Sequence, residues 1–171
     1  MSRIAPLTLE QAPAAAHTAL QGIHKGLGFI PNAFATLAHS PAALGGYLAL
    51  SQALNRNSLT AAEREIAALA ASQVNGCDYC IAAHSFFGAK LGLDDQALAG
   101  ARAGTQGAVA ALARAVTLSR GQLSDEQLAT AREGGLDDGK IIDVIAQVAL
   151  LTFTNYLNNV AQTTIDFPPC A

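Results

Sequence analysis

This sequence has little charge, few aromatic residues and no tryptophan. Charged residues make up 13% of its 171 positions, against about 25% in a typical domain, and the net charge is -3. The lysines and arginines form no cluster of the kind that binds nucleic acids or anionic membranes, so neither partner is expected. Abundant Ala and Leu beside 5% aromatic residues favour helix over strand. We therefore expect an all-α fold.

Long apolar runs are also missing. Residues 1–17 contain Glu10 and two prolines and lack the apolar run of a signal peptide. The most apolar late segment, 141–153, contains Asp143 and Gln147 and is shorter than the ~20 residues that cross a membrane. These absences predict a soluble, cytoplasmic protein. Because 51% of the residues are hydrophobic and few are charged, we also expect apolar surface to be buried between subunits, and thus a homo-oligomer.

The chain is long enough for one domain with a substantial core, which we expect to cover residues 1–171. Residues 1–40 predict a segment that wraps around the rest. Periodicity, N-capping residues and Gly/Pro breaks predict the following helices: 8–23, 33–39, 41–54, 60–75, 77–92, 93–102, 107–120, 123–132 and 141–164.

Residues 60–92 form a predicted pair of helices. Thr60 and Glu63 fit a capping box at the start of the first helix, and Asn75-Gly76 ends it because both residues tolerate a left-handed backbone. If the chain doubles back at Gly76, the second helix packs antiparallel to the first. Glu65 lies eleven residues before the turn and His84 eight after it, a mismatch of three residues or ~4.5 Å. Glu65 is therefore predicted to face His84.

Two of the three cysteines lie in the stretch VNGCDYCIAAHS, at 74–85. Cys77 and Cys80 are one helical turn apart, close enough for a reversible disulfide. The positive end of a helix lowers the pKa of a nearby thiol. His84 lies one turn beyond Cys80 on the same face, where it can accept the thiol proton or favour the thiolate. These features indicate a redox-active pair.

Other interpretations of this stretch were weighed. A purely structural role for the pair stays open. Zinc is not expected, because Cys77, Cys80 and His84 leave a tetrahedral site one ligand short. Covalent haem attachment needs a histidine directly after the second cysteine, where the chain has Ile81. We therefore expect no metal and no cofactor.

Several further polar or sulfur-containing residues receive no firm function from the sequence. Cys170 is interpreted as a small hydrophobic residue. The final helix carries Asn155, Asn158 and Asn159, which either line an interface or pocket or are ordinary polar positions. Three further histidines are interpreted as surface or capping residues: His17, His24 and His39.

Glu65, Cys77 twelve residues later and the pattern C-x-x-C-x-x-x-H together resemble the signature of AhpD-like alkylhydroperoxidases, in the carboxymuconolactone decarboxylase superfamily. The flanking stretches GFIPNAFATLAHSPAALGGYLAL and FTNYLNNVAQTTIDFP are similar to its peroxidase-related branch. The resemblance implies an all-helical fold and a thiol-dependent peroxidase that reduces organic hydroperoxides through a dithiol/disulfide cycle. Its partners would be a hydroperoxide and a thiol or dithiol reductant.

Carried over by position, the resemblance implies four site residues. Cys80 would attack the peroxide and become a sulfenic acid, while Cys77 would donate a proton and then resolve Cys80 to a disulfide. Glu65 and His84 would form a proton relay. One departure is Tyr79, which stands where the best-known members have histidine. Two alternatives remain: a general thiol–disulfide oxidoreductase or redox sensor, and a lactone-processing member of the same superfamily.

Overall fold

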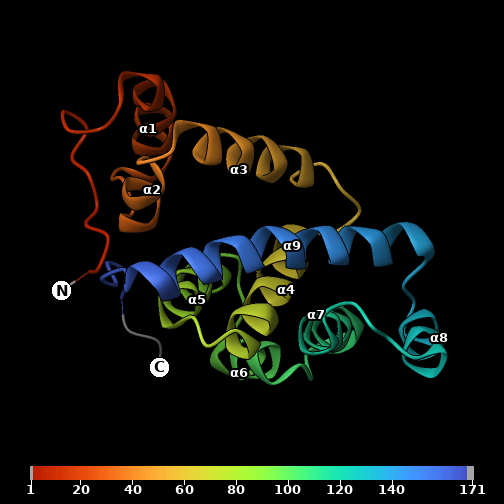
Figure 1. Cartoon of the computed structure of the whole chain (residues 1–171). Helices are drawn as coiled ribbons and strands as arrows, with labels where there is room; N and C mark the ends of the chain where they lie inside the picture. Colours follow the sequence, from red (N-terminus) through yellow and green to blue (C-terminus); the bar gives the residue numbers. More distant parts are fainter. Residues whose placement is uncertain (1, 169–171) are drawn as a thin grey trace.

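The computed structural model describes residues 2–168, and within this range the chain forms nine α-helices and no strand (Figure 1). This confirms the all-α prediction for the described part of the chain. The helices are α1 (Ala14–Leu27), α2 (Asn32–Leu37), α3 (Pro41–Leu54), α4 (Ala61–Val74), α5 (Asp78–Lys90), α6 (Asp95–Ala103), α7 (Gly107–Ser119), α8 (Asp125–Glu133) and α9 (Asp138–Ala161).

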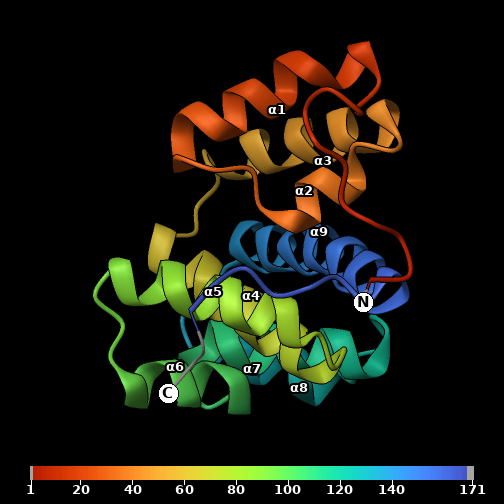
Figure 2. The ribbon, with the colours of Figure 1, turned by 90° about the vertical axis from the view of Figure 1, so that its left-hand side faces the viewer.

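The long helix α9 crosses the molecule between two groups of helices. Figures 1 and 2 show α1, α2 and α3 on one side of α9, and α4 to α8 on the other. The main core lies where α4 packs against α5, α6, α7 and α9, and Leu69, Val144 and Leu151 are fully buried there. A second apolar cluster joins α1, α2 and α3 around Leu20 and Leu44. The α9 helix thus has neighbours on both sides.

The turn between α4 and α5 positions the cysteines. A capping box starts α4, where Thr60 and Glu63 each bond to the other's backbone N–H. Gly76 has φ +61°, a left-handed conformation that glycine adopts without strain, and the Cys77 N–H donates to the Ser72 carbonyl at 3.0 Å. The two helices pack against each other and fold back as predicted.

The ends of the first and last helices differ from the prediction. Helix α1 begins at Ala14 rather than at residue 8, because Thr8 and Gln11 bond to each other in a preceding turn and Pro13 takes the N-cap position. Helix α9 begins earlier than predicted, with Asp137 as its N-cap accepting from the Lys140 N–H at 2.7 Å. It ends at Ala161, three residues before the predicted end, where the chain turns left-handed.

Helix α9 is long and apolar enough to cross a membrane, judged only by length and composition. Half of its most apolar window is buried inside the protein, however, and the core helix of a soluble protein passes the same test. Its exposed large apolar residues are Ile142, Ile145, Phe153, Tyr156 and Val160. The finding is therefore weak evidence for a membrane span.

Candidate active site

Cys77 and Cys80 are free thiols at the start of α5. Cys77 is the N-cap residue, and its sulfur accepts a hydrogen bond from the Cys80 backbone N–H at 3.3 Å. The Cys77 thiol donates to the Cys80 sulfur, and the two Sγ atoms lie 2.7 Å apart. Both side chains are buried, with 0% and 3% exposed. Little movement is therefore needed to join them in a disulfide.

The two thiols differ in acidity. The hydrogen bond from Cys77 lowers the pKa of Cys80 to about 6, helped by the charge of His84 and a hydrogen bond from Asn158 Nδ2 at 3.3 Å, and burial only partly opposes this. The same Cys77–Cys80 bond, together with burial, raises the pKa of Cys77. At neutral pH the pair therefore holds a thiolate at Cys80 and a protonated thiol at Cys77.

Glu65 and His84 meet across the α4–α5 interface, as the helix geometry predicted. His84 donates its Nδ1–H to Glu65 Oε2 at 2.7 Å, and the side chains are 20% and 19% exposed. Burial disfavours the charged ring, but the Glu65 charge and hydrogen bond outweigh it and raise the pKa of His84. Within residues 2–168 no hydrogen bond joins His84 to Cys80, so the ring acts on this sulfur through its charge.

The three asparagines of α9 contact the cysteine turn. Asn158 donates to the Cys80 sulfur as described, and Asn159 Nδ2 donates to the Asn75 carbonyl at 2.8 Å. Asn155 accepts from Asn75 Nδ2 at 2.9 Å and donates to Ser72 Oγ at 3.0 Å. From the sequence, these residues either line an interface or pocket or are ordinary polar positions, and the structure places Asn158 in the pocket wall. Their i, i+3, i+4 spacing, which places them on one helix face, was the signal that could have found them.

Tyr79 connects the cysteine turn to the start of α2 and to the segment after α9. Its hydroxyl donates to Asp166 Oδ1 at 2.8 Å and accepts from the Ala33 N–H at 3.2 Å, while Asp166 Oδ2 accepts from the Asn32 N–H at 2.7 Å. Burial raises the pKa of Tyr79. At the position where the best-known members of the resembled family have histidine, this chain therefore has a neutral phenol that bonds to Asp166 of the C-terminal segment.

A small pocket of about 90 Å³ opens onto the Cys80 sulfur. Ligand pockets commonly measure about 300–1,000 Å³, so this one suits a ligand of few atoms. Phe167 closes one side, with Phe29, Tyr79, Phe86 and Phe87 around it at 5.6–5.8 Å between ring centres. The pocket is lined by Leu27, Pro31, Ala33, Phe34, Leu37, Tyr47, Tyr79, Cys80, Ala83, His84, Phe87, Thr154, Leu157, Asn158 and Phe167. It is mostly apolar, with the reactive sulfur in its wall.

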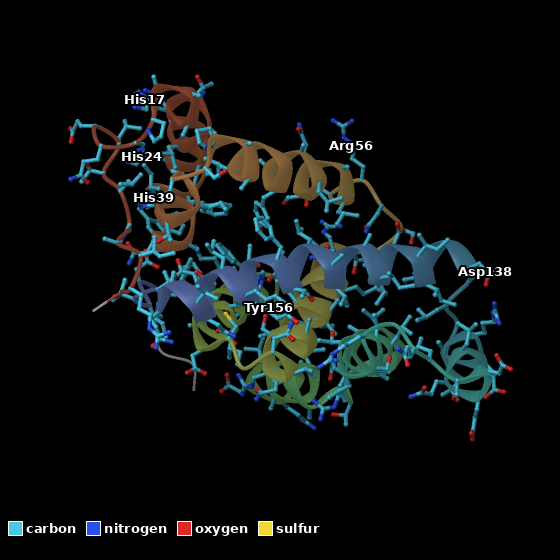
Figure 3. All side chains as sticks on the ribbon, in the orientation of Figure 1. His17, His24, His39, Arg56, Asp138 and Tyr156 are labelled. Atoms are coloured by element: carbon cyan, nitrogen blue, oxygen red, sulfur yellow. The ribbon has the colours of Figure 1, made fainter. Side chains whose placement is uncertain are left out.

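The remaining histidines lie elsewhere. Figure 3 shows His17, His24 and His39 on the side of α1 and α2, away from the sulfur atoms. His17 and His39 each bond a backbone carbonyl at 2.9 Å, of Ala12 and Ala5 respectively. Between residues 2 and 168, no group of three or more His, Cys, Asp or Glu side chains is arranged to hold a metal ion. Cys170 lies outside the described residues.

Comparison with known proteins adds a family match and several structural neighbours. Residues 41–118, which include Glu65, both site cysteines and His84, match the model of the carboxymuconolactone decarboxylase family. No curated protein sequence matches the chain.

The structural neighbours share its fold over nearly the whole length. An AhpD-core, peroxidase-related protein from Ralstonia eutropha JMP134 superposes with a TM-score of 0.85 at 24% identity, covering 96% of this chain and 92% of the other. A peroxidase-related protein from Silicibacter sp. TM1040 has a TM-score of 0.79 at 20% identity, covering 92% and 88%. The debrominase Bmp8, a cysteine variant of which was solved with 2,3,4-tribromopyrrole, also has a TM-score of 0.79 at 20% identity, covering 95% and 91%.

Proposed function

Because residues 41–118 match the carboxymuconolactone decarboxylase family model and the described chain has an AhpD-like fold, we propose that this protein is a thiol-dependent peroxidase acting on small, apolar hydroperoxides. One observation carries the proposal. A buried Cys80 with a pKa of about 6 faces an apolar pocket while the protonated Cys77 thiol lies 2.7 Å away. Peroxide reduction needs a thiolate to attack oxygen and an acid to protonate the leaving oxygen.

The reaction is proposed to begin at Cys80. Its thiolate attacks the terminal oxygen of ROOH, the O–O bond breaks, and the leaving alkoxide takes the proton of Cys77. This step gives ROH, a sulfenic acid on Cys80 and a thiolate on Cys77. The Cys77 thiolate then attacks the sulfenic sulfur, which forms the disulfide and releases hydroxide, protonated to water. A thiol or dithiol reductant supplies two electrons and two protons to restore the pair.

Glu65 and His84 are proposed to manage the protons of this cycle. The raised pKa of His84 makes its imidazolium a suitable donor to the released hydroxide, and the Glu65 bond at 2.7 Å fixes the ring. Because His84 makes no direct hydrogen bond to the Cys80 sulfur within the described chain, we infer that a water molecule carries the proton between them.

The pocket supports this proposal over some of its alternatives. At about 90 Å³ the pocket is small beside the about 300–1,000 Å³ of common ligand sites, which suits a short alkyl hydroperoxide better than a ring with several bromine atoms. Burial of both sulfurs also disfavours a protein disulfide as the oxidant, because a large partner cannot reach them. Nothing in the pocket favours a lactone over a hydroperoxide.

The test is a peroxidase assay with tert-butyl hydroperoxide, a dithiol reductant and matched variants. Cys80→Ser should abolish turnover, and Glu65→Gln should lower it by about 100-fold, the lower end of common general acid–base contributions. Glu63→Gln is the matched control on the same helix, because Glu63 bonds Lys140 and the helix cap instead of the site. Retained turnover in Cys80→Ser, or faster oxidation of the reduced pair by oxidised glutathione than by peroxide, would refute the proposal.

A further inference from the structure

Tyr47 lines the pocket from the opposite group of helices. It lies on α3, and its side chain lines the pocket together with Cys80, His84 and Asn158. Its ring packs against Phe34 and Phe153, with ring centres 5.7 and 6.4 Å away. These contacts fix the direction of the phenol by packing alone.

The Tyr47 hydroxyl is a donor without an acceptor. Among residues 2–168 it makes no hydrogen bond, although the hydroxyl of Tyr79 makes two. Burial raises the pKa of Tyr47, and the charges of Cys80 and Glu65 raise it further. The phenol is therefore protonated at neutral pH. The charge of Cys80 acts on it across the pocket that both residues line.

Asn158, which also lines the pocket, has an acceptor without a donor among the described residues. Asn158 is 3% exposed, and its Nδ2 donates to Cys80, but its Oδ1 is buried with no hydrogen-bond partner in the described chain. Leaving a buried polar atom unpaired costs about 1–3 kcal/mol. A ligand that both accepts and donates a hydrogen bond would satisfy Tyr47 and Asn158 together.

We propose that Tyr47 is a catalytic residue whose hydroxyl binds the alkyl-bearing oxygen of the hydroperoxide. This inference rests on the proposed function. The terminal O–H of ROOH donates to Asn158 Oδ1, which holds the terminal oxygen beside the Cys80 sulfur that attacks it. As the S–O bond forms and the O–O bond breaks, negative charge develops on the alkyl-bearing oxygen. The Tyr47 O–H donates to that oxygen until the proton of Cys77 completes ROH.

The test compares two reactions of the same sulfur. Tyr47→Phe removes the hydroxyl and keeps the ring contacts. In a single turnover, the rate at which tert-butyl hydroperoxide oxidises reduced Cys80 should fall about 100- to 1,000-fold. Alkylation of Cys80 by iodoacetamide breaks no O–O bond. Its rate should therefore change by less than about twofold, and its pH midpoint by less than about 0.3 pH unit. Tyr156→Phe is the matched control, because Tyr156 is 58% exposed on α9 (Figure 3).

Each outcome has a definite meaning. Oxidation of Tyr47→Phe within twofold of the wild-type rate overturns the inference and leaves the proposed peroxidase function intact. Equal losses in oxidation and alkylation also overturn it, because they show that Tyr47 only maintains the structure around Cys80. A wild-type protein that is alkylated normally but is not oxidised by hydroperoxide refutes the proposed function itself, and the role of Tyr47 with it.

Discussion

The low pKa of Cys80 depends on the hydrogen bond from Cys77, which substitutions of Cys77 can weaken or remove. Its pKa of about 6 lies roughly 2.5 below the ordinary value of about 8.5, which corresponds to about 3 kcal/mol in favour of the thiolate. The largest single cause is the bond from the Cys77 thiol, 2.7 Å away. A hydrogen bond to an ionised group contributes about 1.5–3 kcal/mol. Cys77→Ala should therefore raise the pH midpoint of Cys80 ionisation by about one to two pH units.

Cys77→Ser is the matched variant for this test, because the serine hydroxyl still donates a hydrogen bond. It should raise the midpoint less than Cys77→Ala does. The midpoint is measured by following thiolate absorbance or alkylation against pH, with all proteins carrying Cys170→Ser so that only site thiols titrate. The rate at pH 7 is a poor readout: the larger thiolate fraction is largely offset by the lower nucleophilicity of an acidic thiol.

The direction of the pH effect follows from the lowered pKa. Cys80 ionises more readily in the folded protein than in the unfolded chain. Its ionisation therefore stabilises the fold fully above about pH 8.5, and this contribution is lost as the pH falls through about 6. The rate at which peroxide oxidises Cys80 should also decline as the pH falls through about 6, because the thiolate is then protonated. A wild-type midpoint near 8.5, or equal midpoints for the serine and alanine variants, would refute the assignment of the acidic thiol to the bond from Cys77.

Two further predictions concern the fold and its assembly. Gly76→Ala should lower the free energy of unfolding by about 1–2 kcal/mol in a urea titration, because alanine is strained at φ +61°. A steric clash adds nothing, since no atom of the described chain beyond the two neighbouring residues lies within 4 Å of the added Cβ. An unchanged urea midpoint would contradict this prediction. For the expected homo-oligomer, Ile142→Lys combined with Val160→Lys should produce a monomer in analytical ultracentrifugation, because these α9 side chains are 64% and 63% exposed; a monomeric wild type would remove the expectation.

Local rules were enough to predict the part of the site that lies within one helix pair. The capping box at Thr60 and the turn at Gly76 fix where α4 and α5 begin and end, and the rise per residue then brings Glu65 opposite His84. Each of these signals lies within about twenty residues of the others. The prediction failed at residue 8, because the backbone N–H groups of Thr8 and Gln11 each bond to the other's side chain, and these bonds compete with helix formation there.

The residues whose place in the site the sequence did not fix reach it from distant parts of the chain. Asn158 is 78 positions from Cys80 in sequence and meets it because α9 packs on α5. Tyr47 comes from α3, in the group of helices on the other side of α9. Asp166 reaches Tyr79 from beyond the end of α9. Periodicity fixes the face a helix presents to its neighbours, but it does not fix which neighbour covers that face.

The difference between the two sulfurs follows from their partners rather than from their distance to the helix end. Both lie in the first turn of α5, where the positive end of the helix favours a thiolate at either position. Only Cys80 receives hydrogen bonds to its sulfur from both Cys77 and Asn158, and a thiolate there disfavours a second charge next to it. The pair therefore keeps one proton, on Cys77. The same arrangement that makes one sulfur nucleophilic thus retains, 2.7 Å away, the proton that the proposed reaction consumes.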